Sequence, residues 1–563
     1  MSMRITCLGL PLTMLTGLFA VGCGSEDSPE SQPVAESVSE QLRYIEPESS
    51  LVAAVDLRFG EGNWEHVQRL ISRGLREYRN VDPDAGFEVP PNLDGALNQA
   101  AGFAGLSFED DVEPLLDGYL VVGLTVAGAK PEPEQRTVVT YRTESDGLQE
   151  VIEKLTEGDE LRPVPGHDDT LLIDSSSALV GGDTIVLVDD SGDGPDGASD
   201  ALLAALDRSE SKEGFAADSL ETAQKETGSD DPLILAAGDL SLGGLLVEGP
   251  GLRRAIEEVP LLGAVQSTSA SVDIGDEGLR SKVRIATDSA QLSAEDVPLG
   301  SAGPLDLPVS DDAIVGASRN QSATTVFATR LARSLFADSQ FVQAVEATER
   351  KLEIDFEQEF LRQFDCPSVS VLDASDTRRF AARSCVKDPE RMRALLPRLT
   401  PELPKILTAL QALEGEGLVA LLLIAPDAPL TPSFGDLLAA VELVPLNDSG
   451  GEESEQLYEL RGLRDPNSEL AFSGPDRVVF GMIGDDFVVG SDRERVREIA
   501  DIETETYVDE AASATKVPGP IALSATGDVP VELAARLIGD LSVSASGDRS
   551  GVDIDLILPF ADE

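Results

Sequence analysis

The chain has 563 residues, 41% of them hydrophobic, which is enough for two or more domains with cores of their own. Its 103 acidic and 43 basic residues give a formal net charge of −60, spread along the whole sequence. A surface this acidic repels nucleic acid, so we expect no nucleic-acid partner. The acidity fits a saline habitat and general solubility equally well.

The first 22 residues predict an export signal. Arg4 is followed by an uncharged run, residues 5–21, and Gly22 then precedes Cys23. This pattern resembles the bacterial lipoprotein signal, in which the cysteine after the cleavage site receives lipid. A transmembrane helix is the alternative, but Pro11 and the polar sequence after Cys23 disfavour it. We expect a palmitate-type lipid anchor on Cys23, which places the chain in the cell envelope, at the cell membrane or the outer membrane.

Residues 23–45 follow the signal, and their first part is rich in Ser, Glu, Pro and Gln with few large apolar side chains. Such a composition cannot bury enough surface to order the chain. We therefore predict an acidic flexible tether over residues 23–45.

Two cysteines remain for a disulfide once Cys7 leaves with the signal and Cys23 is lipidated. Cys366 and Cys385 are expected in an oxidising compartment, and the sequence between them alternates like a hairpin around residues 374–377. Pairing Asp373 with Arg378 puts the two cysteines opposite each other, within disulfide range. Two free buried thiols are the alternative.

The sequence contains segments that recur in the same order. The matched pairs are residues 47–58 with 308–319, 181–190 with 483–492, 232–249 with 520–539, and 269–286 with 542–559. We therefore predict two related tandem halves, residues 46–290 and 309–563, joined by a Pro/Gly-rich linker over 291–308. A chance likeness between strand patterns is the alternative.

Each half mixes helical and strand patterns. Trp64 lies on the apolar face of a helix that Asn63 caps, and a second amphipathic helix is expected at residues 325–336. The expected strands are residues 119–126, 137–142, 368–372, 380–386 and 478–482. The apolar run within residues 411–430 predicts one more, buried strand. The fold class is α+β, with an antiparallel sheet and packed helices in each half.

These features together resemble a known family. The lipoprotein-like signal, the strand after the letters ESSL, and the segment FEDDVEPLLDGYLVVGL at residues 108–124 are similar to the bacterial exported family called domain of unknown function 3352. The resemblance covers most of the mature chain. It implies no activity and no site residues, because the family has none assigned.

Catalytic motifs are scarce. The two histidines, His66 and His167, are too few for a metal cluster or a pair of acid and base, so we interpret both as surface or hydrogen-bonded residues. No Gly-x-Ser-x-Gly motif occurs. Acidic pairs are so abundant that none of them indicates catalysis.

The stretch VLVDDSGDGPDGASD, residues 186–200, contains a Gly-x-Gly-x-x-Gly pattern between a strand and a helix. Its five aspartates would each repel a pyrophosphate by roughly 1–3 kcal/mol at about 5 Å. One helix N-terminus cannot offset that repulsion. We expect no nucleotide and no other cofactor.

The same stretch has the spacing of a calcium loop. Asp189, Ser191 and Asp193 occupy its first, third and fifth positions, Gly194 the turn position, and Asp200 the twelfth. A strand replaces the usual entering helix, and an Asp the usual last Glu. A solvated acidic turn explains the same residues and is preferred, with calcium as the alternative.

The sequence thus predicts a lipid-anchored, non-catalytic envelope protein that binds an unidentified envelope protein or polymer or has a structural role. An envelope hydrolase with carboxylates in a cleft between the halves is the alternative. A buried pair of carboxylates with a displaced pKa in a large pocket would favour the hydrolase, and a broad exposed apolar patch would favour binding.

Overall fold

The structure is a computed structural model of the whole chain. It describes residues 33–560 apart from several internal stretches. Those stretches are residues 60–61, 82–92, 128–133, 157–160, 191–193, 240–249, 310–312, 338, 365–366, 374–375, 377, 407–441, 447–454, 463–476 and 518–536. Cys23, Cys366 and the apolar run within residues 411–430 therefore lie outside the described residues.

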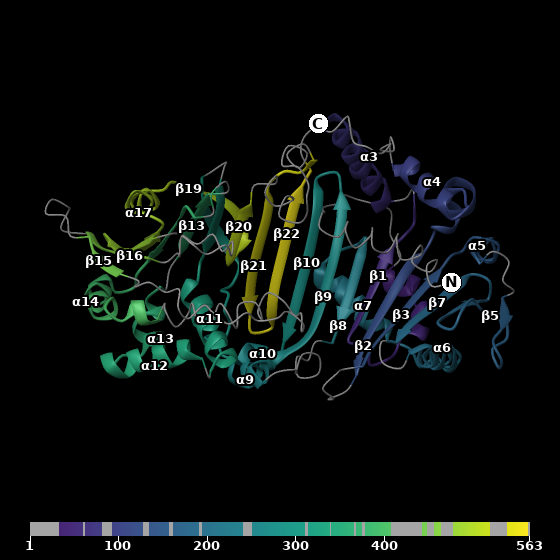
Figure 1. Cartoon of the computed structure of the whole chain (residues 1–563), viewed down its shortest axis with the longest axis horizontal. Helices are drawn as coiled ribbons and strands as arrows, with labels where there is room; N and C mark the ends of the chain where they lie inside the picture. Colours follow the sequence, from purple (N-terminus) through teal and green to yellow (C-terminus); the bar gives the residue numbers. More distant parts are fainter. Residues whose placement is uncertain are drawn as a thin grey trace.

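In the described part of the chain, one antiparallel sheet of 20 strands runs through both halves (Figure 1). Ten strands come from the first half: β1 Leu51–Asp56, β2 Tyr119–Ala127, β3 Glu134–Arg142, β4 Arg162–Pro163, β5 Thr170–Leu172, β6 Ser177–Val180, β7 Thr184–Asp190, β8 Ile234–Gly238, β9 Val265–Gly275 and β10 Gly278–Thr287. Ten come from the second half: β12 Ala313–Ser318, β13 Ser368–Asp373, β14 Phe380–Cys385, β15 Glu442–Pro445, β16 Glu455–Arg461, β17 Arg477–Ile483, β18 Asp486–Gly490, β20 Ser513–Val517, β21 Leu541–Asp548 and β22 Gly551–Pro559. The α+β class is confirmed. The expectation of a separate sheet in each half is wrong, because β10 pairs with β22.

The strand order is the same on both sides of this central pair. Outward from the centre it runs β10, β9, β8, β1, β2, β3, β7, β6, β5, β4 on one side and β22, β21, β20, β12, β13, β14, β18, β17, β16, β15 on the other, with β18 to β15 joined in sequence order. On the second side the β16–β17 pair occupies the place of β5–β6.

Three of the matched sequence pairs fall on strands that hold equivalent places: β1 with β12, β7 with β18, and the hairpin β9–β10 with the hairpin β21–β22. The match of residues 232–249 with 520–539 is wrong, because the strand in the place of β8 is β20, which ends at Val517. A common origin of the halves stays a prediction.

The helices of the first half are α2 Val34–Ser37, α3 Asn63–Val81, α4 Leu93–Phe103, α5 Leu148–Leu155, α6 Gly194–Ser211, α7 Ala217–Thr227, α9 Pro250–Glu258 and α10 Pro260–Ala264, with short turns η1 Gln41–Tyr44, η2 Phe108–Val112 and η3 Glu113–Leu115. Those of the second half are α11 Gln321–Leu335, α12 Gln340–Leu352, α13 Phe356–Glu359, α14 Pro389–Leu399 and α17 Arg493–Ala500, with the turn η4 Leu361–Gln363. No helix in the described part of the chain is long and apolar enough to cross a bilayer.

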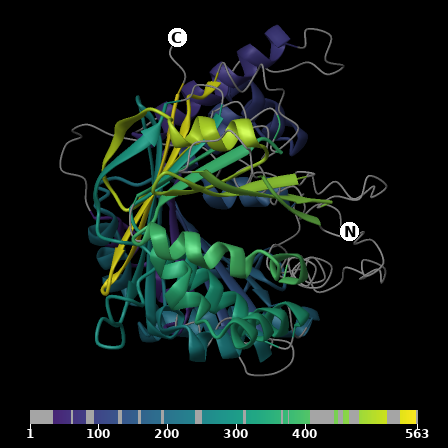
Figure 2. The same ribbon diagram turned by 90° about the vertical axis from the view of Figure 1, so that its left-hand side faces the viewer.

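Helices cover both faces of the sheet in each half. On β6, Ala178 belongs to the core under α6 and α7, whereas the next residue, Leu179, belongs to the core under α5. On β17, Val479 packs toward α17 and Phe480 toward α14. Successive strand residues point to opposite faces, so each half has three layers. Figure 2 shows α17 on one side of the strands and the larger helix group on the other.

The tether prediction is wrong for residues 33–45. Val38 and Ile45 have no exposed surface, and with Leu42 they belong to the core of the first half. The composition is polar on average, but these apolar residues recur at a spacing that places them on one side of α2 and η1. The ordered chain therefore begins well before β1.

The expected linker, residues 291–308, also contains regular structure. Gly303–Pro308 forms strand β11, which pairs with β19 Thr504–Ala511 in a separate two-stranded sheet. Leu305 and Leu307 are buried there in the core of the second half. Two leucines spaced two residues apart are the strand signal that the Pro/Gly content obscured.

Candidate functional site at the seam between the halves

The pairing of β10 with β22 joins the two halves edge to edge, and we call this strand pair the seam. It contains nine directly opposed pairs, from Gly278 with Pro559 to Ala286 with Gly551. Lys282 stands opposite Asp555, and Arg284 stands opposite Asp553. The seam lies at the middle of the molecule in Figure 1.

The seam joins a basic strand to an acidic one. Arg280, Lys282 and Arg284 alternate along β10 and therefore share one face, which Asp553 and Asp555 share on β22. Arg280 Nε donates to Asp555 Oδ1 at 2.9 Å, and Arg284 Nη1 donates to Asp553 Oδ2 at 2.5 Å. The hydrogen bond to Asp553 raises the pKa of Arg284 above its ordinary value. These pairs fix the register of the seam.

A pocket of about 220 Å³ lies on this face, and we call it the seam groove. The residues that line it are Glu226, Thr227, Lys282, Val283, Arg284, Ser544, Ala545, Ser546, Asp553, Ile554 and Asp555. They come from α7, β10, β21 and β22, so both halves contribute. Lys282 Nζ donates to the carbonyl of Thr227 at 2.9 Å. This hydrogen bond connects strand β10 to the end of helix α7.

One carboxyl group near the groove has a displaced pKa. Burial raises the pKa of Asp273, and Ser229, Lys282 and Ser271 offset this in part. Ser229 Oγ donates to one carboxylate oxygen, and Ser271 Oγ lies 3.4 Å from the other. Asp273 is thus a carboxyl group beside the groove that burial makes harder to ionise.

The groove offers hydroxyl, carboxylate and cationic groups within a small volume. Its charged side chains already have protein partners, so a ligand would compete for hydrogen bonds and would gain little from net charge. A volume of about 220 Å³ is below the roughly 300–1,000 Å³ of pockets that enclose a small molecule. The groove is suited to a short polar segment of a larger partner.

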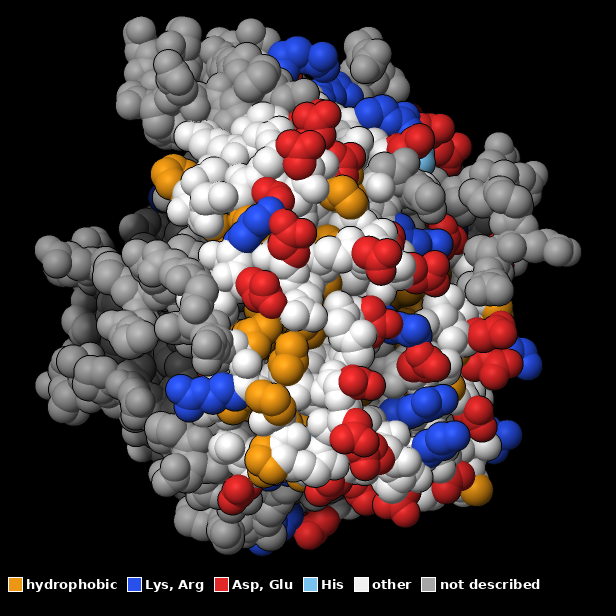
Figure 3. Space-filling view, turned by 90° about the vertical axis from the view of Figure 1, so that its right-hand side faces the viewer, with side chains coloured by type: hydrophobic (Ala, Val, Ile, Leu, Met, Phe, Trp, Pro, Cys, Tyr) orange, Lys and Arg blue, Asp and Glu red, His pale blue; other side chains and the backbone are white. Residues whose placement is uncertain are grey.

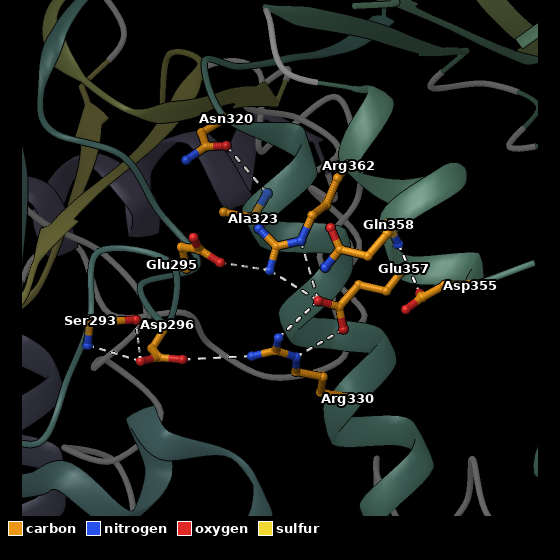
Figure 4. Close-up of polar contacts among 10 residues, drawn as sticks. All are labelled: Ser293, Glu295, Asp296, Asn320, Ala323, Arg330, Asp355, Glu357, Gln358 and Arg362. Atoms are coloured by element: carbon orange, nitrogen blue, oxygen red, sulfur yellow. Dashed lines mark hydrogen bonds and ion pairs between the residues drawn. The ribbon is translucent and has the colours of Figure 1, made fainter. Parts of the chain in front are cut away.

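A second polar cluster holds the connection between the halves in place (Figure 4). Glu357 on α13 accepts from Arg330 of α11 at 2.8 Å and from Arg362 of η4 at 3.0 Å. Arg330 also lies 3.6 Å from Asp296, and Arg362 lies 3.2 Å from Glu295. The connecting segment is therefore bound to the helices of the second half.

This cluster shifts the titration of its central carboxylate. Burial raises the pKa of Glu357, but the hydrogen bonds from Arg330 and Arg362 outweigh burial and hold that pKa below its usual range. Near the cluster, Ser334 of α11 donates to Glu258 of α9 at 2.8 Å, which links the halves again. The arrangement is a saturated ion-pair network, which suits positioning more than chemistry.

The structure places the predicted calcium residues as follows. Asp189 and Asp200 are both exposed, whereas Ser191 and Asp193 lie outside the described residues. Helix α6 begins at Gly194, so the second part of the supposed loop is helical and does not have the backbone that this kind of calcium loop needs. No cluster of three or more metal-ligating side chains occurs among the described residues.

The histidines have carboxylate neighbours. His66 lies 3.5 Å from Asp276, and His167 lies 2.8 Å from Glu210. Burial lowers the pKa of His66, helped by the nearby Arg69. Neither histidine contacts the seam groove, whose lining includes none.

Cys385 ends β14 and is disulfide-bonded. Its expected partner, Cys366, lies outside the described residues, so their pairing stays a prediction. The hairpin register differs by one residue from the predicted one, because the N–H of Asp373 bonds to the carbonyl of Arg379 and not across to Arg378. The turn is one residue longer than the sequence suggested.

The sequence analysis did not predict that the residues of the seam form a site. The letters RSKVR in β10 and DIDLI in β22 lie at corresponding places in the two predicted hairpins, 269–286 and 542–559. Their opposite charges were the signal that could have predicted the pairing. The carboxyl group of Asp273 gave no such signal, because it differs from the other acidic residues only in its burial.

Comparisons with known proteins give little further guidance. No family model matches the chain, and no curated protein matches it. Crystal form I of TP0453 aligns with 44% of this chain and 78% of its own, at 8% identity and a TM-score of 0.21. Crystal form III aligns with 45% and 81%, at 9% identity and a TM-score of 0.23. A likeness this weak carries no functional argument, and the resemblance to domain of unknown function 3352 stays a prediction.

Proposed function

We propose that this chain is a lipid-anchored, non-catalytic binding protein of the cell envelope, which holds a polar segment of a protein or polymer in the seam groove. The observation that carries the proposal is the groove itself, which both halves build and which ion pairs across the seam hold in shape. Its small volume favours part of a long partner over a whole small molecule. The anchor at Cys23 and the envelope location rest on the sequence.

Site-specific crosslinking in intact cells tests this proposal. A photoreactive residue is placed at Ser546 in the groove, and in a matched control at Glu346, an exposed position on α12. We expect an adduct of defined mass from the groove probe and none from the control. Adding Ser544→Arg, which fills the groove, should remove that adduct while leaving the thermal unfolding temperature unchanged. Identical adducts from both probes, or none from the groove, would contradict the proposal.

A hydrolase is the second candidate, and Asp273 is the observation that favours it. Burial raises the pKa of Asp273, and a carboxyl group that keeps its proton to a higher pH is better suited to act as a general acid. The discriminating variant is Asp273→Asn, which keeps the hydrogen bond from Ser229 but cannot release a proton. Turnover of a polymer substrate by the parent that Asp273→Asn abolishes without loss of crosslinking supports the hydrolase. Crosslinking in both proteins with no turnover by the parent supports binding.

A further inference from the structure

The floor of the seam groove contains two hydroxyl groups that no protein group occupies. Ser544 and Ser546 of β21 line the groove and are half-buried. Ser544 stands opposite Asp555 of β22, and Ser546 stands opposite Asp553. In the described part of the chain, neither side-chain hydroxyl makes a hydrogen bond to protein. Two residues along a strand span about 7 Å, so a bound chain would meet the hydroxyls one after the other.

Two carboxylates that line the same groove each use one oxygen. Asp553 is bonded to Arg284 through Oδ2, and Glu226 accepts from Ser269 through Oε2 at 2.6 Å. Neither carboxylate makes a further hydrogen bond among the described residues. Each therefore has a second oxygen that can accept from a ligand, next to serines that can both donate and accept.

This combination of groups matches a partner that bears hydroxyls. A hydroxyl can donate to a carboxylate oxygen and accept from a serine at the same time, whereas an ammonium or an amide N–H can only donate. Ile557 lies two residues beyond Asp555 on the same face of β22 and is 39% exposed. Its side chain offers an apolar contact to the C–H groups of a sugar ring.

The groove is close to neutral in a strongly acidic chain. Its lining contains three carboxylates and two basic side chains, and Arg280 adds a third cation through its bond to Asp555. Figure 3 shows, by contrast, carboxylates spread over one end of the molecule with fewer Lys and Arg side chains between them. The net charge of −60 repels a polyanion, and a polycation would bind to many places besides the groove. A neutral polymer is the partner that the groove can select by hydrogen bonding.

The strands that form the floor have no edge to offer to an extended peptide. Strand β10 pairs with β9 and β22, and β21 pairs with β22 and β20, so each described floor strand has a neighbour on both sides. A peptide that binds to a sheet typically adds to an edge and bonds through its main chain. In this groove its main-chain groups would lack those partners, whereas a polysaccharide has no main-chain amides to satisfy.

We propose that the partner held in the seam groove is a neutral polysaccharide of the cell envelope, bound through its hydroxyl groups. The inference rests on the proposed function and names the class of partner. A sugar hydroxyl between Ser546 and Asp553 accepts from the serine and donates to the aspartate. The ion pairs of the seam stay intact, because the sugar uses only groups that they leave available.

Native affinity electrophoresis of the full-length protein in mild detergent tests the proposal. Polysaccharides from the envelope of the cells that make the protein are treated with protease and divided by ion exchange into a neutral and an anionic fraction. We expect the neutral fraction in the gel to retard the protein and the anionic fraction to leave its mobility unchanged. Ser544→Ala/Ser546→Ala should weaken the retardation by about tenfold, because two hydrogen bonds are lost.

The matched control is Ser281→Ala, which removes a hydroxyl from β10 on the face of the sheet opposite the groove and should not change the retardation. Both variants must keep the unfolding temperature of the parent. No retardation by the neutral fraction, retardation by the anionic fraction alone, or equal losses in the two variants would overturn the inference.

Crosslinking from the groove separates this failure from a failure of the proposed function. An adduct that periodate shortens contains sugar, because periodate cleaves vicinal diols, and this is the expected result. An adduct to a peptide would overturn the polysaccharide and leave the proposed function standing. The absence of any adduct from the groove would overturn the proposed function itself.

Discussion

Asp56 at the end of β1 has a side chain only 1% exposed, and Arg58 holds it with hydrogen bonds of 2.9 and 2.8 Å. The guanidinium of Arg58 also lies 5.0 Å from the centre of the Tyr119 ring and bonds to Asp231 at 2.9 Å. Burying an ion pair is tolerated only with such satisfied geometry. Removing the carboxylate would leave a half-buried guanidinium without its main partner.

We predict that Asp56→Ala lowers the free energy of unfolding by about 3–5 kcal/mol. Asp231→Ala removes the other carboxylate, whose side chain is 28% exposed, and should cost only about 0–1 kcal/mol. Urea unfolding of both variants measures the difference. Equal losses would show that burial of Asp56 does not decide the strength of the contact.

Glu357 should make stability depend on pH in a definite direction. Its folded pKa is held below its usual range, so the carboxylate stabilises the fold above the unfolded pKa of about 4.3, and that contribution is lost as the pH falls through the folded value. We therefore expect Glu357→Gln to cost about 1–3 kcal/mol at a pH of about 7 and less at a pH of about 3. Urea unfolding at both pH values is the measurement, and a cost that grows toward low pH would contradict the assignment.

Among the elements, the segment before β1 differs most from its prediction. Gly123 of β2 faces it, because a Cβ added there would lie 2.3 Å from Ile45 Cγ2. Gly123→Ala should therefore cost about 1–3 kcal/mol. Shortening the partner by Ile45→Ala should remove that clash, so that the double variant loses less than the sum of the singles.

The control for this experiment is Gly102→Ala on α4, where the added Cβ has no atom within 4 Å and stability should not fall. Thermal or urea unfolding of the four variants gives the coupling. Strict additivity of Gly123→Ala and Ile45→Ala would mean that residues 33–45 do not pack on β2 in solution.

Much of the local structure could be predicted from the sequence, because periodicity decides it. The strands that begin at Tyr119, Ser368 and Phe380 start where alternation predicts, and α3 begins at Asn63, the residue expected to cap it. The predictions from average composition were wrong where a few apolar residues decide the packing. This happened in the expected tether, at Val38, and in the expected linker, at β11. The seam could not be predicted from either half alone, since pairing between distant edges depends on the other half.

At the scale of the whole molecule, the seam makes two similar halves into one sheet. Unpaired edges invite pairing with other chains. Here a basic β10 meets an acidic β22, whereas two copies of β22 would bring Asp553 and Asp555 against like charges, which is unfavourable. The charges thus favour closure within one chain.

The predicted lipid anchor also belongs to this scale. We predict that the mature protein begins at a lipid-modified Cys23 and that Cys23→Ala shifts it from the membrane fraction to the soluble fraction, because the lipid chains supply the membrane affinity. Mass analysis of the N-terminal peptide and fractionation measure this. An unmodified N-terminus upstream of Cys23 would refute the anchor.

The seam is the central claim of this account, since the groove and the arrangement of both halves depend on it. Val283 of β10 stands directly opposite Ile554 of β22, so cysteines at these two positions are at disulfide distance. Val543 of β21 is one strand farther away, opposite Leu556, and provides the matched control. Peptide mapping under mild oxidation should find a disulfide within one chain for Val283→Cys/Ile554→Cys and none for Val283→Cys/Val543→Cys. Free thiols in the first variant, or crosslinks only between chains, would contradict the claim.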